Sequence, residues 1–102
     1  MAVPERETRL DADRLAALLA AGTGWRQEGP TLTKTYTFKG FKGAVAFANR
    51  VAEAANAANH HPDIHVERYK TVRVVLTTHV AQGLTDADLD LAAAIDAADR
   101  DS

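Results

Sequence analysis

Apolar residues recur every three or four positions in three separate stretches of the chain, which is the spacing of an amphipathic helix. These stretches predict helices over 10–21, over 41–58 and from Leu84 to Ala98. The apolar faces are predicted to hold Leu15, Leu18 and Leu19 in the first helix, Phe41, Ala44, Val45, Ala48, Val51, Ala52 and Ala55 in the second, and Leu84, Leu91, Ala94, Ile95 and Ala98 in the third.

Residues with helix-capping chemistry stand at the ends of two of these helices. Asp11 or Asp13 is the candidate N-cap of the first helix, and Gly22 is its candidate C-cap. At the start of the last helix, Thr85-x-x-Asp88 resembles a capping box in which aspartate replaces the usual glutamate. We therefore expect Thr85 and Asp88 to serve first as helix caps.

Four runs between the helices have the composition of β-strands. They predict strands over 25–28, 31–39, 64–68 and 71–78. In the second run threonine occupies every other position, so this strand is expected to have one apolar face. Tyr69-Lys70 is the expected turn between the last two strands.

The predicted order of elements is α-β-β-α-β-β-α. Two hairpins and three short helices favour an α+β fold, a two-layer sandwich with a four-stranded antiparallel sheet and helices on one face. A chain of 102 residues is expected to form one domain over 1–102, with the polar residues 1–9 frayed. Such a sheet has edge strands to which a second copy of the chain can add.

The amino-acid composition and net charge exclude several classes of function. The formal net charge is -2 and no basic run is present, so direct binding to nucleic acid is not expected. The absence of cysteine excludes disulfides and thiolate chemistry and fits a cytoplasmic protein. The sequence contains neither a signal-peptide core nor an apolar run that would span a membrane.

Aromatic residues fall on the apolar phases of the predicted elements. We therefore expect Trp25, Tyr36, Phe41 and Phe47 in the core, and the ammonium of Lys34 in water near a sheet edge. The last helix is expected to have a solvated acidic face formed by Asp86, Asp88, Asp90, Asp96, Asp99 and Asp101.

Three of the four histidines lie in two short segments, at His60-His61 and at His79. Histidine exchanges protons near neutral pH and also binds metals, so the cluster indicates proton transfer or a metal site. Pro62 pushes His61 towards an extended conformation, in which neighbouring side chains point to opposite faces. This arrangement suits a three-histidine zinc site poorly. His65 fits neither segment and is expected on the solvent face of a strand.

Four motifs in the chain resemble those of the pterin-4a-carbinolamine dehydratase family, and the resemblance covers about 10–98. The His60-His61-Pro62 triplet alone is a weak signal, but its combination with the other motifs and with the predicted order of elements is specific. The motifs are Phe41-x-x-Ala44-x-x-Phe47, Asn59-His60-His61-Pro62, Leu76-x-Thr78-His79 and Gly83-Leu84-Thr85-x-x-Asp88.

This resemblance implies a hydro-lyase that converts 4a-hydroxytetrahydrobiopterin (pterin-4a-carbinolamine) to quinonoid dihydropterin in tetrahydropterin recycling, without a metal or organic cofactor. It implies that His60, His61 and His79 are catalytic, with His61 and His79 as an acid/base pair and His60 positioning the substrate. Proton transfer both to the leaving hydroxyl and from the pterin suits groups that titrate near neutral pH.

The same resemblance implies that Pro62, Asp63, Thr78 and Asp88 bind the substrate or support the site. Three departures from the family pattern follow. Asn56 stands where many relatives have a glutamate, Ile64 stands where an aromatic residue is common, and one additional residue is expected near 65–71.

Two further interpretations remain open. A non-catalytic binding module on the same fold, acting as a transcriptional cofactor or an assembly chaperone, has no chemical need for three histidines. A pterin-binding protein with vestigial activity would fit the departures at Asn56 and Ile64. In each case the family resemblance implies a homodimer or homotetramer, and a protein partner is compatible with the fold.

Overall fold

The computed structural model describes residues 8–100, so the expected frayed segment lies almost entirely outside the described residues, as does Asp101. The predicted order of elements is confirmed, with one 3-10 helix added before the last helix. The elements are α1 (Ala12–Ala20), β1 (Arg26–Glu28), β2 (Thr31–Thr37), α2 (Phe41–Ala58), β3 (Asp63–Glu67), β4 (Thr71–Leu76), η2 (His79–Ala81) and α3 (Asp86–Arg100).

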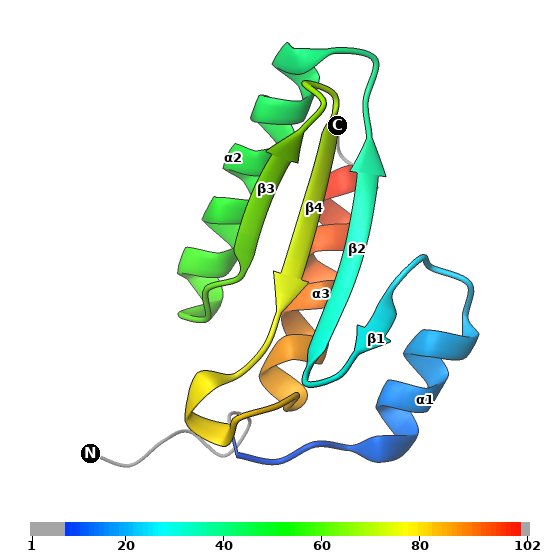
Figure 1. Ribbon diagram of the computed structural model, residues 1–102. Helices are drawn as coiled ribbons and strands as arrows, with labels where there is room; N and C mark the ends of the chain where they lie inside the picture. The colour runs from blue at the N-terminus through cyan, green and yellow to red at the C-terminus, as the bar shows by residue number, and fades with distance from the viewer. Residues whose placement is uncertain (1–7, 101–102) are drawn as a thin grey trace.

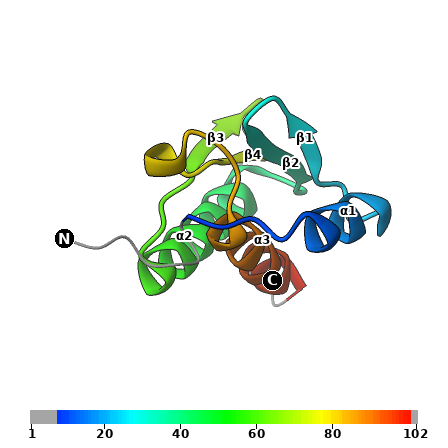
Figure 2. The same cartoon turned by 90° about the horizontal axis from the view of Figure 1, so that it is seen from below.

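The strands form one four-stranded antiparallel sheet in the order β1-β2-β4-β3. Figures 1 and 2 show α2 and α3 against one face of this sheet, with α1 beside the β1 edge. The expected two-layer α+β architecture is therefore confirmed. Among residues 8–100, no helix combines the length and the apolar character that crossing a membrane requires.

The hairpin between β3 and β4 has room for an additional residue. Its register runs without a bulge from Asp63 opposite Val75 to Glu67 opposite Thr71. The chain then reverses through 68–70, where Arg68 and Tyr69 have left-handed φ angles of 50° and 56°. Because the ladder is regular, any additional residue lies in the turn and leaves the faces of both strands unchanged.

The helices bury faces that differ in part from the predicted ones. Phe41 is 59% exposed, although it was expected in the core, because it begins α2, whose first turn extends past the β3–β4 turn (Figure 1). Val45 is also exposed. In α3, Ala94 is exposed as well. The helical residues that are buried instead are Leu15 in α1, Ala44, Phe47, Val51 and Ala55 in α2, and Ala87, Leu89, Leu91, Ala92 and Ile95 in α3.

The helix caps follow the prediction in part. Asp11 is the N-cap of α1, and its carboxylate accepts hydrogen bonds from the backbone N–H groups of Asp13 and Arg14. The C-cap is Ala21, one residue earlier than predicted, and Gly22 follows it with a φ of 71°. Glycine adopts this left-handed conformation at low steric cost, so it still marks the end of the helix.

A polar cluster joins α3 to the sheet. One oxygen of the Asp96 carboxylate accepts hydrogen bonds from Tyr36 Oη at 2.6 Å and Lys34 Nζ at 2.8 Å, and the other accepts from Trp25 Nε1 at 3.0 Å. The side chains of Lys34 and Asp96 are each only 16% exposed. The expectations that the Lys34 ammonium lies in water and that Asp96 is solvated are therefore wrong, because α3 lies over β2 and brings the two charges together.

The environment of Tyr36 predicts how stability depends on pH. Burial, with the hydrogen bond and negative charge of Asp96, raises the pKa of Tyr36 far above its ordinary value. Above pH ~10 the unfolded chain loses this phenolic proton while the folded chain keeps it, so the free energy of unfolding should fall as pH rises. In Tyr36→Phe this decline should be smaller, as measured by denaturant unfolding between pH 8 and 11. An equal decline in both proteins would contradict the burial of a protonated phenol.

The Asp96 cluster also predicts the cost of removing its carboxylate. Asp96→Ala leaves a half-buried ammonium and two donors without their acceptor, so it should lower the free energy of unfolding by about 2–4 kcal/mol. Asp90→Ala is the matched control on the same helix, since Asp90 pairs with Arg14 at 2.7 Å where both side chains are more than 40% exposed. It should cost less than about 1 kcal/mol. Urea unfolding measures both, and equal losses would argue against the cluster as an anchor.

Candidate functional site

The end of α2 places the histidine pair. Asn59 caps the helix with left-handed angles of φ 51° and ψ 42°, a conformation that asparagine adopts more readily than most residues. The N–H of His60 then donates to Ala55 O at 3.1 Å. The chain thus leaves the helix with His60 turned inward, where it is 8% exposed, and His61 exposed at the surface.

The end of β4 places the third histidine. The strand ends at Leu76, two residues earlier than predicted, but Thr78 still pairs with Gly83 in an isolated antiparallel bridge. Two backbone hydrogen bonds, of 2.9 and 3.3 Å, close this bridge. The four residues between them contain η2 and a left-handed Gln82, with φ 56°. The bridge therefore holds His79 on a short closed loop next to the end of α2.

Asp88 lies behind His60 with its side chain fully buried. One carboxylate oxygen is 2.7 Å from His60 Nε2. The other accepts hydrogen bonds from Thr78 Oγ1 at 2.7 Å and from the backbone N–H of Thr85 at 2.9 Å. The expectation that Asp88 belongs to a solvated face is wrong, because this residue is the shared acceptor for three segments of the chain.

The hydrogens in this network follow from its donors and acceptors. A carboxylate at Asp88 only accepts, so His60 Nε2 carries a hydrogen. Thr78 gives its single hydroxyl hydrogen to Asp88 and therefore accepts from Thr85 Oγ1, at 2.8 Å. The expected capping box is present in part, since Asp88 accepts from the N–H of Thr85, whereas the Thr85 hydroxyl bonds to Thr78.

His61 has a different partner. Its Nε2 is 3.2 Å from Oδ1 of Asn56, the residue in the last turns of α2 where many relatives were expected to carry a glutamate. An amide oxygen accepts a hydrogen bond but carries no full charge. The departure at Asn56 therefore lies in direct contact with one of the predicted catalytic histidines.

One open pocket of about 190 Å³ brings the predicted histidines together. Of the sequence-predicted site residues, His60, His61, Thr78 and His79 line it. The lining also includes three residues outside the predicted site, namely Asn59, Thr77 and Val80.

The remaining predicted residues lie around this pocket. Asp88 supports His60 from behind, and Pro62 is half-buried at the start of β3. Asp63 is exposed, and the alternation along β3 places it with His65 on the sheet face away from the helices. His65 is exposed, as expected. Among residues 8–100, no group of three or more histidine, aspartate or glutamate side chains is arranged to hold a metal ion.

Val80 lines the pocket but was not among the site residues predicted from the sequence. It is 67% exposed on η2, directly after His79. Its adjacency to His79 was the only signal in the sequence, since an isolated valine after a strand has no distinctive pattern. The pocket therefore combines three imidazoles with one exposed apolar side chain.

The chain resembles one known family and several known proteins over most of its length. The profile of the family described as pterin 4 alpha carbinolamine dehydratase matches residues 8–98. A Thermomicrobium roseum protein, provisionally named a pterin-4-alpha-carbinolamine dehydratase, is 51% identical over 84 residues, which cover 82% of this chain and 89% of that protein. A Thermosynechococcus vestitus protein with the same provisional name is 45% identical over 87 residues, which cover 85% of this chain and 90% of that protein.

Two solved structures have a similar fold. A transcriptional coactivator/pterin dehydratase from Brucella melitensis aligns with a TM-score of 0.77 and 30% identity, over 88% of this chain and 97% of that one. A pterin dehydratase-like protein identified as a RuBisCO assembly factor in the α-carboxysome aligns with a TM-score of 0.63 and 26% identity, over 76% of this chain and 90% of that one. Since the family profile and these relatives match nearly the whole chain, the protein belongs to the pterin-4a-carbinolamine dehydratase family.

Proposed function

We propose that this protein dehydrates 4a-hydroxytetrahydropterins to quinonoid dihydropterins during tetrahydropterin recycling. The observation that carries the proposal is the meeting of His60, His61 and His79 at one open pocket. Family membership supplies the substrate class, and the names of the relatives point to the same reaction. In this proposal the protein acts as a cytoplasmic hydro-lyase.

The proposed reaction needs one proton donor and one proton acceptor. As the C4a–O bond breaks, the acid protonates the departing hydroxyl, which leaves as water. The base removes a proton from a ring nitrogen, and the electron pair of that N–H bond forms the new double bond. One proton is given and one is taken, so the enzyme returns to its starting state after His61 and His79 exchange protons with each other or with solvent.

The surroundings of the three histidines support different roles for them. His61 and His79 are exposed and line the pocket, so both can exchange protons with substrate and water. His60 is buried and held by Asp88 at 2.7 Å, which restricts its ring orientation. We therefore assign the acid/base pair to His61 and His79 and the orientation of the substrate to His60.

The roles proposed for the supporting residues follow the same geometry. Thr78 and Asp88 fix His60 and the start of the η2 loop. Pro62 shapes the segment that leaves the histidine pair. Asp63 does not line the pocket, and its proposed contact with substrate stays a prediction from the family resemblance.

A second candidate function is a non-catalytic binding module. The specific observation in its favour is the structural likeness to a RuBisCO assembly factor, at 26% identity. A folded protein without dehydratase activity that forms a stable complex with a macromolecule would favour this alternative. The three histidines around the pocket favour the enzyme.

The histidine assignments predict the effect of three substitutions. Removal of either member of the acid/base pair, in His61→Ala or His79→Ala, should lower the rate of quinonoid dihydropterin formation about 10²- to 10⁴-fold. His65→Ala is the matched control, since His65 is exposed on β3 outside the pocket lining, and it should keep the full rate. Stopped-flow absorbance with freshly generated 4a-hydroxytetrahydropterin measures all three. If wild type does not exceed the spontaneous reaction, the proposed function fails.

The contact between Asn56 and His61 predicts a change in pH dependence. A carboxylate at this position favours the protonated form of the neighbouring imidazole, so in Asn56→Glu the limb of the pH–rate profile that reports His61 should move to higher pH. Asn56→Gln is the control for side-chain length, because it has no charge. Rates for the two variants between pH 5 and 9 test this, and coincident profiles would argue against a catalytic role for His61.

A further inference from the structure

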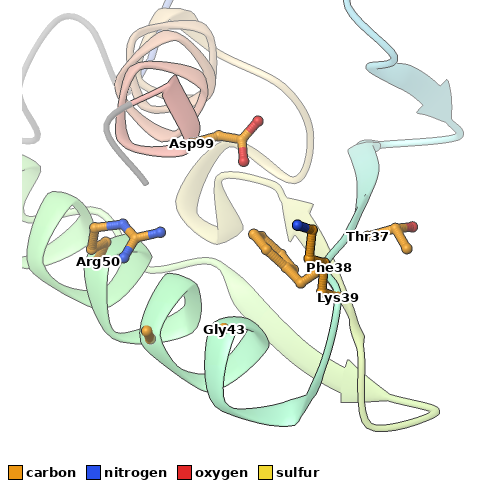
Figure 3. A pocket seen from close by; sticks show the side chains of 7 residues that line it. Thr37, Phe38, Lys39, Gly43, Arg50 and Asp99 are labelled. Carbon is orange, nitrogen blue, oxygen red and sulfur yellow. The ribbon is translucent and has the colours of Figure 1, made fainter.

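A second and larger cavity lies along the first half of α2, away from the histidine pocket at the other end of that helix. Its volume is about 570 Å³. Figure 3 shows its lining from three elements, with Phe38 and Lys39 after β2, Gly43 and Arg50 on α2, and Asp99 on α3. Thr37 and Ala46 complete the lining. A cavity of this size accommodates a small organic molecule.

Two cations of this lining, Lys39 and Arg50, have N–H groups that donate no hydrogen bond within residues 8–99. Arg50 donates through Nε to Ala98 O at 3.3 Å, and its guanidinium lies 5.6 Å from the centre of the Phe47 ring. Within residues 8–99, neither the terminal Nη groups of Arg50 nor Lys39 Nζ has an acceptor. Asp99 contributes the one carboxylate, so the lining carries a net charge of +1.

The remaining walls are apolar. Phe38 is half-buried, and its ring centre lies 5.1 Å from that of Phe47, which fixes one side of the cavity. On the side formed by α2, the lining residues Gly43 and Ala46 are small and occupy little of the cavity. The cavity therefore combines two cations with a flat apolar surface.

Gly43 stands in the first turn of α2 without a steric reason inside the chain. A Cβ added there would lie 3.7 Å from Phe38 Cβ and 4.0 Å from Cδ1, which is ordinary contact. Its φ is not in the left-handed region, and alanine favours a helix more than glycine does. The missing side chain weakens the helix locally and keeps the cavity open beside Phe38.

We propose that this cavity is a second binding site, for a small organic carboxylate. The carboxylate lies between Arg50 and Lys39, because a guanidinium matches the planar geometry of two carboxylate oxygens. The apolar body lies over Phe38 and Gly43. A net lining charge of +1 matches a single negative charge better than the two charges of a phosphate ester.

The test is a ¹H–¹⁵N NMR titration of the labelled protein with three probes of one shape. Benzoate should shift resonances of 37–50 and of Asp99 and leave those of 59–61 and 77–80 in place. Benzamide, which is neutral, should bind at least about tenfold more weakly, the loss expected for one charge-assisted hydrogen bond. Phenyl phosphate should bind no more tightly than benzoate. Equal affinity for benzamide, tighter binding of phenyl phosphate, or shifts at the histidine pocket alone would overturn the assignment.

Three variants locate the binding within the cavity. Gly43→Leu fills the space beside Phe38 with a residue that favours the helix, so it should abolish benzoate binding without loss of thermal stability. Lys39→Gln should weaken binding about tenfold. Lys42→Gln is its matched control, since Lys42 is an exposed lysine on α2 outside the lining, and it should bind as wild type does.

Unchanged binding in Gly43→Leu, or equal weakening by both lysine variants, would refute the proposal. Dehydratase activity is not the readout, so this result is independent of the proposed function.

Discussion

The buried carboxylate of Asp88 is the constraint on which the site depends. A charge removed from water is costly unless hydrogen bonds replace its hydration. Here His60 Nε2 approaches one oxygen, and Thr78 Oγ1 and the Thr85 N–H donate to the other. These donors come from the exit of α2, the end of β4 and the start of α3. The need to satisfy one carboxylate therefore joins the start of α3 to the end of β4, 10 residues away, and to the exit of α2, 28 residues away.

A second carboxylate on the same helix fixes its other end. Asp96 follows Asp88 by eight residues, about 12 Å along the helix axis. It accepts hydrogen bonds from Trp25, Lys34 and Tyr36 at the sheet. Two anchors separated along one helix restrict both its rotation and its sliding over the sheet. The position of Asp88 behind His60 thus follows from the packing of the whole helix layer.

Most of the fold could be predicted from the sequence, because hydrophobic periodicity determines the type and order of elements. Periodicity does not tell how far a helix extends beyond the sheet, so Phe41 was predicted buried although it begins α2. Pairs of charges distant in sequence were also missed. Lys34 and Asp96 are 62 residues apart, and each alone resembles an ordinary surface residue.

The candidate site was also predicted only in part. Family motifs identified the three histidines that the structure brings to one pocket, and Asp88 was expected to support them. The burial of Asp88 was not foreseen, since a single aspartate in an acidic helix looks solvated. Val80 joined the lining without a sequence signal, whereas Asp63 was predicted at the site and lies outside the lining. The Thr78–Gly83 bridge closes the loop that carries Val80, and a sequence pattern does not encode this closure directly. The alternation of side chains along β3 decides the face on which Asp63 lies.

The measurement that tests this account most directly is the long-range ¹H–¹⁵N correlation spectrum of the four histidine rings, with and without a 7,8-dihydropterin. The account predicts that Nε2 of His60 is protonated in both samples because it faces the Asp88 carboxylate. It also predicts that the pterin shifts the ring nitrogens of His61 and His79 and leaves those of His65 unchanged. An unprotonated Nε2 on His60, or a pterin that leaves His61 and His79 unaffected, would contradict it.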